Sequence, residues 1–136
     1  MTRSRVGDVF RILDAVADDR APEAFRLLGE RLRDGDDELA VLGALGYQLR
    51  KLAATARLVH AGQPLGPAMD AAGVAKWPLA RQGVERQLRH LGLSRAMQLS
   101  DWLVDINLGL KGGNPLPRRM QLELLLTKIA KPRAAA

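Results

Sequence analysis

The chain has 136 residues, of which 47% are hydrophobic and 26% are charged, proportions that are ordinary for a folded soluble protein. It contains no cysteine, which excludes disulfide scaffolds, thiolate metal sites and cysteine nucleophiles. Aromatic residues make up only 4%, so the core must be mainly aliphatic, and this favours helices over strands. The longest apolar stretch, 39–47, is far shorter than a membrane span, and the N-terminus has no apolar signal-peptide segment. We therefore expect a cytoplasmic protein with no membrane partner.

The net charge of +6 arises entirely in the second half of the chain. Residues 1–68 carry ten basic and ten acidic side chains, whereas residues 69–136 carry eleven basic and five acidic ones. Such a distribution suits a nucleic-acid surface, a surface for an acidic protein, or an ordinary solvated surface. The basic residues are scattered along the sequence, which favours the solvated surface.

Apolar spacings of three and four residues predict three helices in the first half. The first covers about 8–17. The second begins near Pro22, because proline suits the first turn of a helix. The third covers about 37–61, and its apolar residues form a long seam for packing against another helix. It ends at Gly62, and Pro64 prevents its continuation.

Four more helices are predicted in the second half of the chain. The first is a short helix at about 66–72, and the second runs from Trp77-Pro78 to Gly92. The third is capped by Ser94 and runs to Leu110. The fourth is capped by Asn114, has Pro115 in its first position, and ends before Lys131. Serine and asparagine are favoured caps because their side-chain oxygens accept hydrogen bonds from the first free amides. No segment alternates with the period of a strand. The expected fold is all-α, a single compact bundle of about seven helices over residues 1–136.

The sequence offers no set of residues suited to catalysis. His60 and His90 have no serine or carboxylate at a suggestive spacing and are interpreted as surface histidines. Asp101 and Asp105 share a helix face, but no second pair of metal ligands accompanies them, so they are expected to be solvated. In Lys111-Gly112-Gly113 the lysine precedes the glycines, unlike in a phosphate-binding loop. We predict a domain that is not an enzyme and has no catalytic, metal or cofactor site.

Nucleic-acid binding is kept as the alternative function. The basic residues near the C-terminus that are able to reach phosphates are Arg118, Arg119, Lys128, Lys131 and Arg133. Single-strand binders interleave such residues with stacking aromatics, and this segment has none. A helix-turn-helix over 79–110 would place Asp101, Trp102 and Asp105 where a groove-reading helix needs Arg, Asn or Gln. The alternative is thus a free-standing basic helical domain that binds nucleic acid without such a motif.

Six short runs follow one another along almost the whole chain. They are Val9 to Val16, Ala24 to Leu28, Leu45 to Leu52, Lys76-Trp77-Pro78, Asp105 to Lys111-Gly112, and Leu122 to Leu126. In this order and spacing they resemble the C-terminal domain of the delta subunit of bacterial DNA polymerase III. That subunit belongs to the clamp loader, which places the sliding clamp on DNA during replication.

The resemblance implies an oligomerisation domain. In clamp loaders the C-terminal domains pack into a circular collar, so the implied partners are the delta-prime and gamma/tau-type subunits. The delta subunit opens the clamp without hydrolysing ATP, and it does so through an N-terminal ATPase-like module. That module does not fit in 136 residues. The chain is therefore expected to be a fragment of a longer subunit, with the clamp contacted only through the missing part and with DNA binding only indirect.

Two sets of residues are expected to contact partners. The first is basic and consists of Arg118, Arg119 and Lys128. The second follows from the two neighbours of a collar subunit, which should leave large apolar patches exposed on the free domain. Its candidates, which lie off the main helix stripes, are Leu27, Leu58, Leu108 and Leu124.

Overall fold

The structure, a computed structural model, describes residues 5–35 and 37–133. The helices in these residues are α1 (Arg5–Ala17), α2 (Ala21–Arg33), α3 (Glu38–His60), α4 (Leu65–Ala71), α5 (Pro78–Leu91), α6 (Leu93–Leu108) and α7 (Arg118–Ala130). A short π-helical segment, η1 (Gly109–Gly113), extends α6. The described residues contain no strand, and the predicted all-α fold is confirmed.

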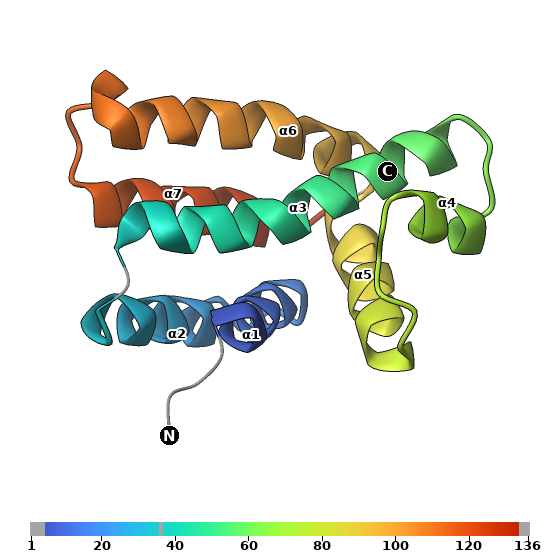
Figure 1. Cartoon of the computed structure of the whole chain (residues 1–136), viewed down its shortest axis with the longest axis horizontal. Helices are drawn as coiled ribbons and strands as arrows, with labels where there is room; N and C mark the ends of the chain where they lie inside the picture. The colour runs from blue at the N-terminus through green and yellow to red at the C-terminus, as the bar shows by residue number, and fades with distance from the viewer. Residues whose placement is uncertain (1–4, 36, 134–136) are drawn as a thin grey trace.

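The longest helix, α3, organises the arrangement. It packs most extensively on α6 and also contacts α1, α4, α5 and α7. Figure 1 shows α6, α7 and α3 running along the long axis, with α1 and α2 on one side and α5 crossing near one end. The turn between α6 and α7 lies at one end of the long axis, and the start of α5 lies well away from it, toward the other end. None of the described helices combines the length and the apolar character that crossing a bilayer requires.

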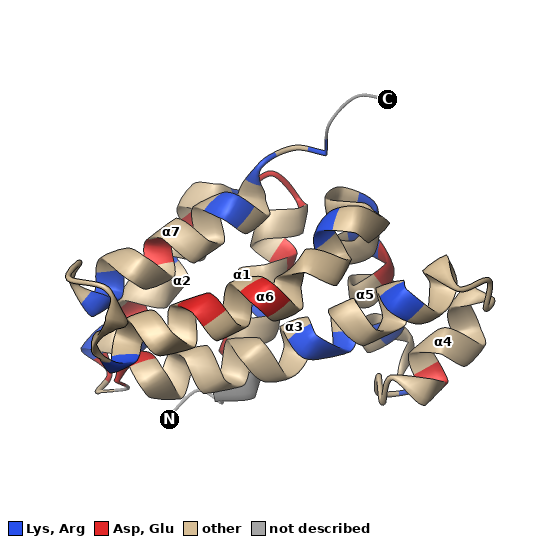
Figure 2. Cartoon of the chain, turned by 90° about the horizontal axis from the view of Figure 1, so that it is seen from above, with Lys and Arg blue, Asp and Glu red and all other residues tan. Residues whose placement is uncertain are grey.

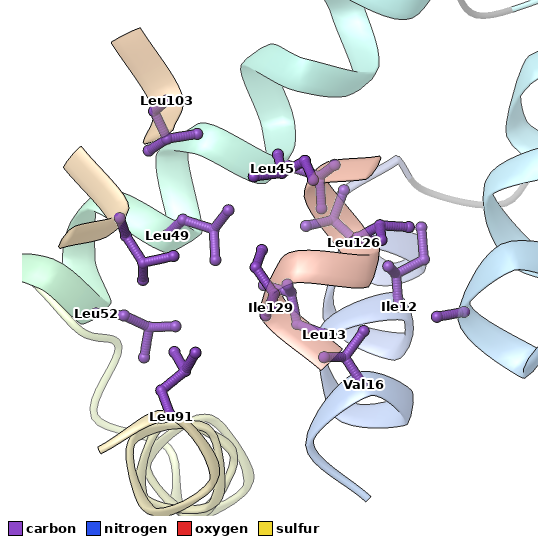
Figure 3. Close-up of a cluster of buried hydrophobic side chains, with 14 of the residues drawn as sticks. Ile12, Leu13, Val16, Leu45, Leu49, Leu52, Leu91, Leu103, Leu126 and Ile129 are labelled. Carbon is purple, nitrogen blue, oxygen red and sulfur yellow. The ribbon is translucent and has the colours of Figure 1, made fainter. Parts of the chain in front are cut away.

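A single hydrophobic cluster fills the space between the helices. Side chains from α1, α3, α5, α6 and α7 converge in its centre (Figure 3). Ile12, Leu45, Leu49 and Leu126 are among the large residues that are fully buried there. Burying one such side chain contributes roughly 1.5–3 kcal/mol. The predicted apolar seam of the third helix is thus the part of α3 that faces this core.

A buried ion pair joins α1 to α2. Arg31 Nη1 lies 3.2 Å from Asp8 Oδ2, and the two side chains are 7% and 3% exposed. Arg11 also approaches Asp8, with its Nη1 3.6 Å from Oδ1, but its own side chain is half exposed. The sequence pattern did not single out Asp8 or Arg31 as buried residues.

The predicted start of the last helix at Asn114 is wrong, because prolines follow it closely. A residue that precedes proline is disfavoured in the α conformation, and a helix starting after Asn114 would require this conformation of Leu116, which precedes Pro117. The Asn114 side chain instead caps a turn, in which its Oδ1 accepts a hydrogen bond from Leu116 N at 3.0 Å. The last helix, α7, therefore begins only at Arg118.

The predicted cap of the sixth helix, Ser94, is also wrong. Gly92 both ends α5 and caps α6, and its φ of 78° lies in the left-handed region that favours glycine. A single residue thus connects the two helices, and Ser94 lies within the first turn of α6. The predicted end at Leu110 falls inside η1, where the helix continues with π geometry.

Candidate interaction surface

The three basic residues proposed as partner contacts are all exposed on α7, but they point to different neighbours. Arg119 pairs with Glu123 at 3.8 Å. Its guanidinium also lies against α2, where a Cβ on Gly29 would be 3.1 Å from Arg119 Nη2. Lys128 Nζ lies 5.0 Å from the centre of the Trp102 ring on α6. Arg118 forms no ion pair with another described residue. The three residues therefore do not form one basic cluster.

The four apolar residues proposed as partner contacts differ in their exposure to solvent. Leu108 and Leu124 are 62% and 52% exposed, as expected for contact residues, and Leu58 is half-buried. The expectation for Leu27 is wrong, because it is only 2% exposed. Its helix, α2, packs on both α1 and α7. Residues of α2 that lie beside the predicted apolar stripe are therefore buried as well. Sequence reasoning missed three further exposed apolar residues near Leu108 and Leu124 in the sequence, namely Val104, Leu116 and Met120.

A groove of about 160 Å³ lies between α6 and α7. Trp102, Asp105 and Ile106 line it from α6, Gln121, Leu124, Leu125 and Lys128 line it from α7, and Asn114 lines it from the turn between the two helices. Ile106 and Leu125 are buried, whereas Asp105, Leu124 and Lys128 are exposed. The groove, defined here by these eight residues, is lined by four apolar side chains, two amide side chains, one acidic and one basic side chain.

Glycines hold the turn that brings α6 and α7 together. A Cβ on Gly109 would overlap Gln121 Oε1, and a Cβ on Gly113 would lie 2.9 Å from the carbonyl oxygen of Leu108. Gln121 is buried, and its Nε2 donates a hydrogen bond to the Leu116 carbonyl at 2.9 Å. Because there is no room for a side chain at Gly109 or Gly113, these contacts restrict the conformation of the turn and of the adjacent end of the groove.

Two carboxylates line the exposed side of α6. Asp101 and Asp105 are one helical turn apart and both exposed, and no ion pair joins either of them to another described residue. Lys128 lines the same groove as Asp105 but forms no ion pair with either carboxylate among the described residues, and its Nζ lies 5.0 Å from the centre of the Trp102 ring. The expectation that this pair is solvated agrees with their exposure. No cluster of three or more potential metal ligands occurs among the described residues.

A second exposed apolar site lies at the start of α5. Trp77 is 72% exposed and Leu79 is 82% exposed. Arg81 fixes the backbone before them, since its Nη2 donates to the Val74 carbonyl at 3.0 Å and to Asp70 Oδ1 at 2.7 Å. The hydrogen bond from Arg81 is the main cause that lowers the pKa of Asp70 below its ordinary value. Trp77 and Leu79 are therefore presented to solvent by an ordered segment.

The two histidines differ in their surroundings. His60 is exposed, as expected. The interpretation of His90 as a surface histidine is wrong, because it is half-buried and its Nε2 lies 2.9 Å from the carbonyl oxygen of Ile129. This hydrogen bond ties α5 to the end of α7. His90 thus has a structural partner that its sequence neighbours did not reveal.

Basic side chains are interrupted on the face that carries α6. Figure 2 shows Lys and Arg at separate positions on α3 and α7, with acidic positions on α6 between them. A hollow of about 340 Å³ elsewhere in the molecule is lined by Arg89 and Arg133, but also by Glu85 and by apolar residues. In both regions acidic positions lie among the basic ones, whereas a nucleic-acid binder typically has basic residues clustered on one face.

One solved structure among known proteins shares the fold. No protein-family model and no curated protein matches the sequence. Among solved structures, the fold is similar to the DNA clamp loader delta protein of Bacillus subtilis, with a TM-score of 0.71 and 16% sequence identity. The similarity covers 96% of this chain but only 38% of that protein, so the chain spans well under half of its length. The chain therefore has a fold found in a clamp loader delta protein.

Proposed function

We propose that this chain is an assembly domain of the clamp loader of DNA polymerase III, corresponding to the C-terminal collar domain of the delta subunit. It would hold the loader together by binding its delta-prime and gamma/tau-type subunits. Contact with the sliding clamp would belong to an ATPase-like module outside this sequence, and contact with DNA would be indirect. The shared fold with a clamp loader delta protein supports this proposal.

The observation that carries the proposal is the presence of exposed apolar side chains at two separate places. Leu108 and Leu124 are exposed near the groove between α6 and α7, whereas Trp77 and Leu79 are exposed at the start of α5. Large apolar surfaces are costly on a monomer and commonly mark protein interfaces. A subunit within a ring has a neighbour on each side, so two separate sites are what a collar domain requires.

We propose further that the domain catalyses no reaction. The half-buried His90 is engaged with the Ile129 carbonyl and so has a structural role. The exposed His60 has no carboxylate or serine beside it in the sequence to form a catalytic pair.

The alternative is a basic helical domain that binds nucleic acid. The basic second half of the sequence favours it, but the carboxylates of Asp101 and Asp105 lie exposed on the α6 surface. A phosphate backbone would be repelled there. The interrupted basic positions in Figure 2 fit a protein partner better.

A pull-down distinguishes the two functions. The chain is immobilised and offered the clamp-loader ATPase subunits of its own organism, with labelled primer–template DNA in a parallel lane. Retention of an ATPase subunit in the absence of DNA is the expected result. Retention of DNA alone, weakening steeply as salt is added, would overturn the proposal and favour the nucleic-acid alternative.

A further inference from the structure

We infer that the groove between α6 and α7 receives one large apolar side chain from a helix of a neighbouring clamp-loader subunit, and that a basic residue on that helix pairs with Asp101 and Asp105. The inference rests on the proposed function. It adds which face of the chain meets a neighbour and what chemistry the neighbour presents.

The size and lining of the groove indicate that the partner side chain entering it is large and apolar. The groove volume of about 160 Å³ leaves room for one large side chain, and the groove is open to solvent on one side. The buried Ile106 and Leu125 form its apolar lining, and Leu124, at 52% exposed, stands at its edge. Filling a pocket of this kind with an aromatic or branched side chain is typical of the few residues that dominate binding energy.

The acidic side chains beside the groove indicate that the partner helix carries a basic residue. The chain as a whole has a net charge of +6, yet the exposed side of α6 next to the groove carries two carboxylates. Asp101 and Asp105 are spaced by one helical turn, and no ion pair within the described residues satisfies them. A partner helix that carries Arg or Lys one turn from its apolar anchor would complement them, because residues three or four apart share a helix face. Complementary charge of this kind sets specificity and the rate of association.

A second copy of the chain fits the surface poorly. A two-fold contact places the same patch on both sides of the interface. If such a contact were centred on α6, Asp101 and Asp105 of one copy would face the same residues of the other copy. Repulsion between these like charges would disfavour association. The same two carboxylates disfavour a nucleic-acid strand. A basic, heterologous protein helix is the occupant that the charges support.

The test compares variants of exposed residues, which should leave folding intact. Leu124→Glu places a charge at the edge of the groove, and Asp105→Lys reverses one of the two carboxylates. Asp34→Lys, at the exposed end of α2 and outside both proposed sites, is the matched control for charge reversal. Circular dichroism checks that each variant is folded. Affinity for each clamp-loader ATPase subunit is then measured by titration calorimetry.

Leu124→Glu and Asp105→Lys should each weaken binding by about tenfold or more, whereas Asp34→Lys should change it by less than about twofold. Added salt should weaken the wild-type complex more than the Asp105→Asn complex, since one charge pair is missing in the variant. If the wild type binds and these variants bind equally well, the inference is wrong while the proposed function stands. If the wild type binds no subunit, the proposed function fails and the inference fails with it. A dimer of the wild type that Leu124→Glu dissociates in sedimentation would make a second copy the occupant and also overturn the inference.

Discussion

Replacing Arg31 by methionine should destabilise the fold strongly, because Arg31 compensates a buried carboxylate. Its Nη1 lies 3.2 Å from Asp8 Oδ2, and both side chains are almost fully buried. Removing one member of a buried pair costs roughly 3–5 kcal/mol, because the other charge stays behind in the interior. Arg11, whose Nη1 is 3.6 Å from Asp8 Oδ1, offsets part of that cost. We therefore expect Arg31→Met to lower the free energy of unfolding by about 2–4 kcal/mol.

Urea denaturation followed by circular dichroism measures this difference, and Arg26→Met on the same helix is the matched control. Arg26 is exposed and pairs with Glu23 at 2.6 Å, and its hydrogen bond lowers the pKa of that carboxyl. Exposed pairs contribute little to stability, so the control should stay close to wild type. The double change Asp8→Leu with Arg31→Met should recover most of the loss, because it leaves no buried charge. The reasoning is refuted if Arg31→Met costs no more than Arg26→Met.

Other substitutions test local geometry. Gly113→Ala should lower the unfolding midpoint, because its Cβ would lie 2.9 Å from the Leu108 carbonyl oxygen. Gly43→Ala, with open space at its Cβ inside α3, should instead raise stability by about 0.5–1 kcal/mol, and equal effects of the two changes in thermal melts would contradict this. Arg81→Met should destabilise the chain at neutral pH. Because Arg81 lowers the pKa of Asp70, the part of this loss that comes from the ion pair should shrink as the pH falls from the ordinary value of 3.8 through the lower folded value. A loss that is the same at every pH would show that Arg81 acts only through its other hydrogen bonds.

The positions of the helices follow closely from apolar spacing and from glycine and proline. The long helix predicted at about 37–61 is α3, Glu38–His60, and Asp37 caps it by accepting a hydrogen bond from Ala40 N at its Oδ1, at 2.6 Å. The misplaced start of the last helix came from treating Asn114 as a helix cap. The rule for residues before proline, applied to Leu116, would have moved that start to the correct side of Pro117.

Exposure was harder to predict than helix position, because it depends on which helices become neighbours. Leu27 and Leu124 both lie off their predicted stripes, yet Leu27 is buried and Leu124 is 52% exposed. The difference arises because α2 packs on two helices, while one side of α7 faces solvent. For the same reason the groove was not foreseen, since its lining residues come from two helices that only the tertiary structure brings together. The spacing of Asp101 and Asp105 was visible in the sequence, but its place beside an apolar groove was not.

Hydrogen exchange in the presence of a partner tests the assembly role most directly. The chain is measured alone and after mixing with the clamp-loader ATPase subunits of its own organism. The account predicts a stable complex in which exchange slows across 104–108 and 120–128, beside the groove, and across 77–79 at the start of α5. Formation of no complex, or of a complex that leaves exchange in all three segments unchanged, would contradict it.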